Sequence, residues 1–199
     1  MADLEKTRKN LEGRGFRVHR FASGAEAAEF LVQTLHGTSI GIGGSVTIDT
    51  LGVYDRLCGS NEVFWHWKNY APETRERAGK AETYLCSANG VSENGEIVNI
   101  DGFGNRVAGT IYGPERVFLV VGRNKIAPDL TGAIDRARNI AAPLNARRLN
   151  RHTPCAVGEP RCHDCRSPEK VCGVMTVFFM PPTSIKEFHV ILVDEDLGY

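Results

Sequence analysis

The stretch Ser39-Ile-Gly-Ile-Gly-Gly-Ser-Val-Thr-Ile-Asp-Thr-Leu51 decides the fold class of this chain. A short apolar run passes into a glycine-rich turn, and the turn passes into a helix that we expect over residues 46–57. A strand, a tight turn and a helix in this order are typical of α/β proteins, which bind ligands at the carboxyl ends of their strands. The stretch therefore predicts an α/β fold and one edge of a ligand site.

The segments on both sides continue this alternation. Before the stretch, we expect a surface helix over residues 2–13, a strand from Phe16 to Phe21, and a helix opened by the capping box Ser23-Gly-Ala-Glu26. After it, apolar runs and turn residues predict strands over 64–67, 83–87, 96–100 and 117–121, and helices over 72–82 and 129–142. The run Val117–Val121 is continuously apolar, which is typical of a strand buried on both faces of a parallel sheet.

Two expectations concern the last third of the chain. Pro143 lacks a backbone N–H, so we expect it to end the preceding helix, with a short continuation to Asn150. Strands are expected over 174–180 and 188–193. The connection between them is short, which favours an antiparallel pair.

Composition excludes several classes of function. The chain has 199 residues, with 24 Lys and Arg against 24 Asp and Glu. A neutral chain lacks the charge that drives indiscriminate binding to nucleic acids or anionic membranes. No apolar run approaches the roughly 20 residues that a membrane-spanning helix needs. The charged start of the sequence does not resemble a signal peptide, so we expect a cytoplasmic protein.

The strongest single motif is Cys155–Cys172, which reads CAVGEPRCHDCRSPEKVC. Its spacing, C-x6-C-x2-C-x6-C, allows two thiolates on a tight turn and two on longer arms to surround one metal centre. The alternatives are two disulfides or four unrelated thiols. We prefer a metal centre at Cys155, Cys162, Cys165 and Cys172, on its spacing and because disulfides persist mainly in oxidising compartments. His152 and His163 are near enough in sequence to replace one cysteine. The spacing alone does not separate zinc from an iron–sulfur cluster.

Three glycine-containing loops also carry polar groups. Gly41–Thr47 can offer backbone N–H groups, two hydroxyls and a helix N-terminus to an anion, or can simply be a tight turn. Asp101–Arg106 places a carboxylate, an amide and a guanidinium on one loop, although Asp and Asn also stabilise turns by bonding their own backbone. Gly122–Lys125 follows a buried strand, so its side chains should emerge at the carboxyl end of that strand.

Arginines recur from residue 136 to residue 151, and we interpret most of them as a solvated helix face. Arg147 and Arg148, which precede the cysteine run, can also bind an anion. Trp65, His66, Trp67 and Lys68 can line or cover a site for a planar anionic ligand, or can be one face of a strand. Cys58 and Cys86 lie in apolar contexts that are typical of small core residues.

Longer stretches of the sequence resemble the LUD-domain (lactate-utilisation) family. The resemblance runs in order over roughly residues 5–199, and the chain is similar to stand-alone members that carry a four-cysteine insertion. It is carried by Gly43-Gly-Ser-Val-Thr47 with Gly52, by Asn99–Ala108, by Gly122-Arg-Asn-Lys-Ile126, by Ala142–Leu149, by Thr153-Pro-Cys155 with the cysteine run, and by Glu195-Asp-Leu-Gly198.

The resemblance implies a fold similar to ribose-5-phosphate isomerase and the CoA transferases. We therefore expect one three-layer α/β domain over residues 1–199, with a mainly parallel sheet and a metal-binding loop at 152–173 inserted before the last two strands. The resemblance also implies a link to the oxidation of lactate or a related hydroxy acid in bacteria, beside iron–sulfur and flavin partner proteins. It does not supply a catalytic mechanism.

From the residues and the resemblance together we predict an anion pocket next to the metal centre, and we favour a [4Fe–4S] cluster over zinc. The ligand is expected to be a small carboxylate or phosphate. Arg106 and Lys125 would neutralise it, and Asp101 is the candidate acid or base. The remaining candidate ligand-binding residues are Gly43, Gly44, Ser45, Thr47, Asn105 and Asn124.

Other functions remain open at this point. One alternative is a zinc-stapled subunit or ligand sensor without catalysis. A second is a CoA or acyl transferase, or an enzyme like a sugar-phosphate isomerase, since Ser92-Glu-Asn-Gly95 spells the segment that holds the nucleophilic glutamate of CoA transferases. That segment is also a good Asn-Gly hairpin turn, and we favour the turn. Binding of nucleic acid through a zinc knuckle is disfavoured by the neutral charge.

Overall fold

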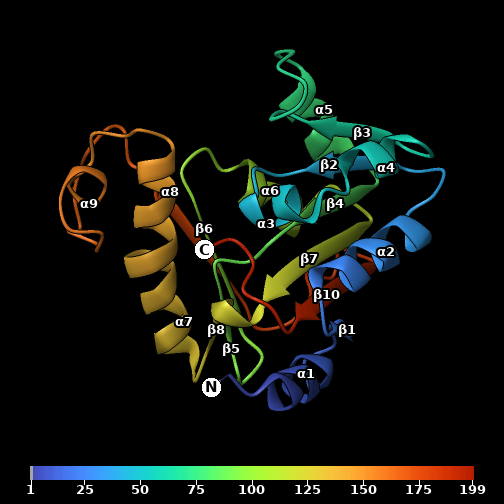
Figure 1. Cartoon of the computed structure of the whole chain (residues 1–199), viewed down its shortest axis with the longest axis horizontal. Helices are drawn as coiled ribbons and strands as arrows, with labels where there is room; N and C mark the ends of the chain where they lie inside the picture. Colours follow the sequence, from blue (N-terminus) through green and yellow to red (C-terminus); the bar gives the residue numbers. More distant parts are fainter. Residues whose placement is uncertain (1) are drawn as a thin grey trace.

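A six-stranded sheet lies at the centre of the computed structural model, which describes residues 2–199 (Figure 1). Its strands follow the order β1 (Arg17–Phe21), β10 (Glu187–Val193), β7 (Arg116–Gly122), β4 (Thr83–Cys86), β2 (Ser39–Ile42) and β3 (Glu62–Trp65). All five neighbouring pairs are parallel. In β7, every residue from Val117 to Val121 is fully buried, as a strand covered on both faces requires. The expectation of an α/β fold with a mainly parallel sheet is confirmed.

A second, smaller sheet was not expected. It has the order β8 (Ile126–Ala127), β5 (Gly90–Ser92), β6 (Ile97–Asp101) and β9 (Val174–Phe178). The expected antiparallel pair of the last two strands is therefore wrong: β9 pairs with β6, and β10 lies between β1 and β7 in the large sheet. Burial gives the reason. From Phe188 to Val193 β10 is buried and mostly apolar, which suits an interior strand, whereas most of β9 is half-buried or exposed, which suits an edge.

Helices cover both sheets. One face of the large sheet packs against α2 (Gly24–Thr34), α3 (Val46–Leu51) and α4 (Tyr54–Cys58). The other face packs against α1 (Leu4–Gly13), α5 (Thr74–Lys80), α6 (Asn105–Ile111) and the small sheet. The far face of the small sheet is covered by α7 (Leu130–Arg136) and α8 (Ala142–Arg148). The small sheet thus adds a layer to the three-layer arrangement that we expected.

Two expected helices differ from the observed ones. The helix expected over 46–57 is divided because Gly52, with φ of 64°, leaves the helix in the left-handed region that favours glycine. Pro143 does not end its helix. Instead α7 and α8 form one column (Figure 1), joined by a π-helical segment at Ala137–Ala141. The wider turn relieves the clash between a proline ring and the carbonyl group four residues before it. None of the helices among residues 2–199 has the length and apolarity needed to cross a membrane.

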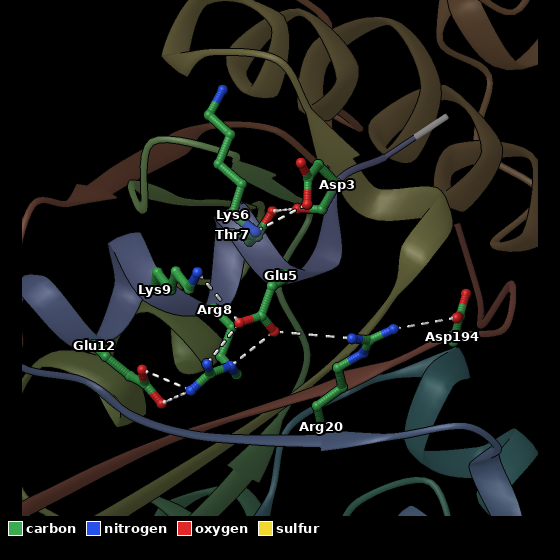
Figure 2. A network of polar contacts seen from close by, with 9 residues as sticks. All are labelled: Asp3, Glu5, Lys6, Thr7, Arg8, Lys9, Glu12, Arg20 and Asp194. Carbon is green, nitrogen blue, oxygen red and sulfur yellow. Dashed lines mark hydrogen bonds and ion pairs between the residues drawn. The ribbon is translucent and has the colours of Figure 1, made fainter.

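An ion-pair network fixes the start of the chain against the sheet (Figure 2). Within α1, Arg8 bridges Glu5 and Glu12 at 2.7 Å each, and Arg20 on β1 lies 3.9 Å from Glu5 and 3.7 Å from Asp194. Asp194 follows β10 and also lies 3.5 Å from Arg123, which begins the 3-10 turn Arg123–Lys125. Exposed pairs of this kind contribute little stability individually. Their role here is to define the position of the loops at the carboxyl end of the sheet.

Candidate functional site

Three neighbouring strands of the large sheet, β7, β4 and β2, end at one small cavity, which we call the inner cavity. Its volume is about 40 Å³. Each strand contributes polar side chains through the loop that follows it. The polar side chains that line the cavity belong to Ser45, Thr47, Ser87, Asn89, Arg106, Lys125 and Asn145, and Trp67 and Tyr199 are its aromatic lining residues. This is the place at which α/β proteins bind ligands.

Lys125 is the most unusual group in the inner cavity. Its side chain is 3% exposed, and its Nζ donates hydrogen bonds to Thr47 Oγ1 at 2.7 Å and to Ser87 Oγ at 2.8 Å. Among residues 2–199 no carboxylate forms an ion pair with it. Burial, with a smaller effect of the nearby Arg136 guanidinium, lowers the pKa of Lys125 to about 7. The amine is therefore neutral in a large fraction of molecules near neutral pH.

Arg106 and Asp101 are placed differently from each other. Arg106 lines the inner cavity, and its Nη2 donates to the carbonyl oxygen of Ile100. Asp101 does not line that cavity. Its two carboxylate oxygens accept the backbone N–H groups of Gly102 at 2.8 Å and Arg106 at 2.9 Å, which holds the loop before α6. The geometry therefore assigns Asp101 to loop structure more readily than to proton transfer.

An outer cavity of about 480 Å³ opens beside the inner one and shares Gly44, Trp67, Arg106, Asn145 and Val171 with it. Five basic side chains line it, against only two acidic ones: Arg75, Arg106, Arg148, Arg151 and Lys170 against Asp101 and Glu169. Two of its aromatic rings carry a guanidinium, with Arg148 4.5 Å from the Trp67 ring centre and Arg75 4.9 Å from that of Phe103. The outer cavity thus presents positive charge and aromatic surface to anything that approaches the inner one.

The remaining predicted pocket residues have mixed positions. Ser45 caps α3 by accepting the N–H of Ile48, and it lines the inner cavity with Gly44. A Cβ atom on Gly43 would approach Arg106 to 2.8 Å, so this glycine permits the close packing of the arginine. Asn105 lines the outer cavity. Asn124 instead bonds the backbone of Leu197 and Gly198, each at 3.1 Å, and so holds the segment that brings Tyr199 to the inner cavity.

The residues of the aromatic stretch 65–68 also lie in different environments. His66 and Trp67 line the outer cavity, which is one of the two placements that the sequence left open. Trp65 is 1% exposed and belongs to the core, and Lys68 pairs with Asp49 at 2.9 Å. Burial lowers the pKa of His66, with the Arg75 charge acting in the same direction.

All four cysteines of the C-x6-C-x2-C-x6-C run line a third cavity, which we call the cysteine cavity. Its volume is about 330 Å³, and it lies beside α8 and the short helix α9 (Pro154–Val157). The four thiols are free and half-buried. Apolar side chains form much of the remaining wall, from Ile100, Ile134, Ala142, Pro143, Ala146, Val171 and Met175.

Polar groups of the helical column and of the loop itself contact the cysteine run. Arg138 Nη2 lies 3.4 Å from Cys162 Sγ, the backbone N–H of Asp164 donates to the same sulfur at 3.4 Å, and Thr153 Oγ1 is 3.3 Å from Cys155 Sγ. The side chain of Asn139 accepts the N–H of Cys162 at 2.9 Å. Burial raises the pKa of Cys172, which an adjacent cation or metal would have to offset.

The thiols surround the cysteine cavity without closing on one point. Across the part of the chain that the structure describes, no three His, Cys, Asp or Glu side chains are close enough together to hold a single ion. A tetrahedral zinc site needs four sulfurs at about 2.3 Å from one atom. In the structure described here the four thiols line the cavity without forming such a shell.

A single layer of side chains separates the cysteine cavity from the inner cavity. Ile100, Ala142 and Val171 line both of them. Gly102 is pressed against the same loop, since a Cβ atom on it would lie 2.7 Å from Cα of Val171. The sequence motif and the strand-end loops, which are far apart in the chain, therefore meet at one wall.

Some site residues were not identified from the sequence. Ser87 ends the predicted strand 83–87, so the rule that selected Lys125 after β7 would also have selected it. Arg136 was interpreted as part of a solvated face, but it is 7% exposed and donates to the carbonyl oxygens of Asn124 and Asn89 at 2.7 and 2.6 Å. Burial lowers its pKa to about 10. Its carbonyl partners are set by tertiary packing, which no local pattern reports.

Glu93 of the Ser92–Gly95 segment lies away from all three cavities, in the hairpin between β5 and β6. Its carboxylate accepts the N–H of Asp3 at 3.0 Å and pairs with Lys6 at 3.1 Å, and these contacts lower the pKa of Glu93. Glu93 therefore connects the start of α1 to the small sheet.

Comparisons with known proteins agree with this architecture. The family model of the LUD domain matches residues 4–193. Among solved structures, a crystal structure of a DUF162 family protein from Deinococcus radiodurans matches with a TM-score of 0.56 and 13% identity, over 96% of this chain and 95% of that one. At that identity the likeness shows the fold alone. No curated protein matches the sequence.

Proposed function

Because this chain belongs to the LUD domain family, we propose that it is a redox component of hydroxy-acid oxidation. In this proposal it binds a small carboxylate or phosphate in the inner cavity and a [4Fe–4S] cluster in the cysteine cavity. Lactate or a related hydroxy acid is the substrate class, and iron–sulfur or flavin proteins of the cytoplasm are the partners.

One observation carries the proposal, namely that both cavities share Ile100, Ala142 and Val171. A group in the cysteine cavity and a ligand in the inner cavity would be separated by one layer of side chains. Electrons cross such a layer without a bond between the two groups. A cluster in the cysteine cavity would therefore be close enough to exchange electrons with a ligand in the inner cavity.

Several features of the cysteine cavity support the proposal of a four-cysteine cluster. Cys155, Cys162, Cys165 and Cys172 would each supply one thiolate, and the apolar wall would shield the cluster from water. Arg138 and the backbone N–H of Asp164 would donate to Cys162 Sγ, and hydrogen bonds to sulfur raise the reduction potential of such centres. When bound, the cluster supplies one-electron chemistry. The residues of this chain hold it and exclude water.

The inner cavity has the features of an anion site. The N–H groups at the start of α3 follow the glycine turn, and Arg106 lines the same cavity as Ser45 and Thr47. Trp67 and the basic outer cavity would guide an anion inward, because charge of one sign in a cleft raises the local concentration of its counter-ion. Asp101 would act by fixing the Arg106 loop.

The test is the metal content and visible spectrum of protein purified without oxygen, beside a Cys162→Ser, Cys165→Ser variant. We expect about four iron and four labile sulfide per chain, with the brown absorption of a cluster, and loss of both in the variant. Addition of lactate should then change the reduction potential of the cluster. About one zinc per chain without colour would instead establish the zinc-stapled subunit. Absence of any metal from both proteins would refute the proposal.

A further inference from the structure

The hydrogen bonds around Lys125 define the direction of its lone pair. Thr47 Oγ1 donates to the carbonyl oxygen of Leu197 at 3.2 Å, and Ser87 Oγ donates to that of Val120 at 2.6 Å. Each hydroxyl has one hydrogen, so both oxygens can only accept from Lys125. A neutral amine has two hydrogens, and these two bonds use both. Its lone pair is left without a partner, and Lys125 is one of the residues that line the inner cavity.

The surroundings favour the unprotonated form of this amine. Three titratable groups act on it: Arg136 and Arg106 disfavour its charge, and the buried thiol of Cys86 acts in the opposite direction. Burial raises the pKa of Cys86, so that thiol is neutral near neutral pH and offers no counter-charge. A lysine in such a place is unsuited to holding an anion by charge. It has instead the properties of an amine nucleophile.

We infer that Lys125 forms a covalent imine with a small 2-oxo acid bound in the inner cavity. This inference rests on the proposed anion site and changes the part that Lys125 plays in it. Arg106 would hold the carboxylate through Nη1, which has no protein partner among residues 2–199. The adjacent carbonyl carbon would then face the lone pair. The inner cavity is small, at about 40 Å³, and it borders the outer cavity, so a short acid suits it.

The step is balanced without any oxidant or reductant. The nitrogen of Lys125 attacks the carbonyl carbon and one of its hydrogens moves to the carbonyl oxygen, which gives a carbinolamine. The C–O bond of that intermediate then breaks. Its oxygen leaves as water with the second hydrogen of the amine, and a C=N bond joins Lys125 to the acid. Protonation of the imine by solvent gives an iminium.

The experiment traps this bond. The complete protein is incubated with pyruvate or glyoxylate, reduced with sodium cyanoborohydride, digested and mapped by mass spectrometry. We expect one reduced adduct, on Lys125, whose rate of formation rises through about pH 7. Lactate shares the carboxylate but lacks the carbonyl group, so it should slow the labelling without forming an adduct.

Two variants sharpen the result. Lys125→Arg keeps a long basic side chain but cannot form an imine, and it should give no adduct. Lys186→Arg is the control, because Lys186 is exposed and paired with Glu115 at the amino end of β10, and it should label at Lys125 like the parent protein. If Lys125→Arg does not fold, the position of the adduct in the parent protein still decides the matter.

Labelling confined to exposed lysines would overturn the inference. So would the absence of any adduct in protein that the same acids stabilise against heat, because the acids would then bind without reacting and the proposed anion site would stand. If the acids neither label nor stabilise the protein, both the imine and the anion site are refuted, whereas the iron content tests the cysteine cavity independently.

Discussion

The inner cavity and the cysteine cavity lie on two sides of one wall, but they are held in opposite ways. The inner cavity is made at the ends of three paired strands, and Lys125 at its centre has two fixed partners. The cysteine cavity is made by a loop whose only regular element is the four-residue α9, and its thiols are half-buried with few contacts. The first cavity forms with the fold, whereas the second, if it holds the proposed cluster, would be completed by that cluster. In such a loop, binding free energy becomes folding free energy.

The largest effect, on metal content, is expected when the cysteine loop is displaced and the strands stay in place. Gly102→Val would place a Cβ atom 2.7 Å from Cα of Val171, and overpacking of this kind costs about 1–3 kcal/mol. We expect the variant to lose most of its bound metal, measured by elemental analysis, and to keep the far-UV circular dichroism of the parent. Gly173→Ala is the control, because its nearest neighbour is Asp101 O at 4.0 Å. Equal metal content in the two variants would contradict the division between the cavities.

The second effect concerns the inner cavity alone. The pKa of Lys125 falls from 10.5 to about 7 on folding, so the unfolded chain binds more protons between these values. Stability therefore rises with pH across that window, by up to about 1.4 kcal/mol per unit, and is lost as pH falls towards 7. Lys125→Met should be more stable than the parent at pH 7, by on the order of 1 kcal/mol, with a flatter pH profile. Denaturant unfolding at several pH values measures both, and a variant with an unchanged slope would show that Lys125 is charged in the folded protein.

A third, smaller effect tests whether Arg138, on the helical column, changes the reduction potential of a cluster in the cysteine cavity. Arg138 donates to Cys162 Sγ, and a positive charge beside a cluster stabilises its reduced form. Arg138→Leu should lower the reduction potential by tens of millivolts in a redox titration. Arg151→Leu removes a charge of the outer cavity that makes no contact with a cysteine, and it should change the potential less. A potential that rises in Arg138→Leu would contradict the assigned role.

The smallest effect is expected at Glu93. Its pair with Lys6 and its bond to the N–H of Asp3 lie near the surface, and interactions of this kind contribute about 0–1 kcal/mol. Glu93→Gln should lower the thermal midpoint slightly and change neither metal content nor the trapping of Lys125. Loss of a CoA-transferase activity in this variant would revive the transferase alternative. A thioester isolated on Glu93 after exposure to an acyl-CoA would do the same.

The sequence could predict those features of the fold and the site that depend only on neighbouring residues in the chain. The apolar run of β7, the glycine turn after β2 and the position of Lys125 at a strand end all follow from a few adjacent residues. The partner of β9 does not, because β6 lies more than seventy positions away and only the packed core selects it. The same holds for the burial of Arg136 and for the wall shared by the two cavities. Pro143 was misjudged because a helix can widen by one residue and accept it.

The π-helical segment Ala137–Ala141 has a consequence for the phase of the helix that follows it. A widened turn inserts one residue into a regular helix, and each residue rotates the helix by about 100°. Before the segment, Ala133 and Ile134 face the small sheet; after it, Ala142 lies against both cavities and Asn145 lines the inner one. Deletion of a single residue from the segment would turn the second set towards solvent and leave the first in place. One inserted residue thus sets the angle at which the column meets both cavities, and the register of this helix is as much a part of the site as any of its side chains.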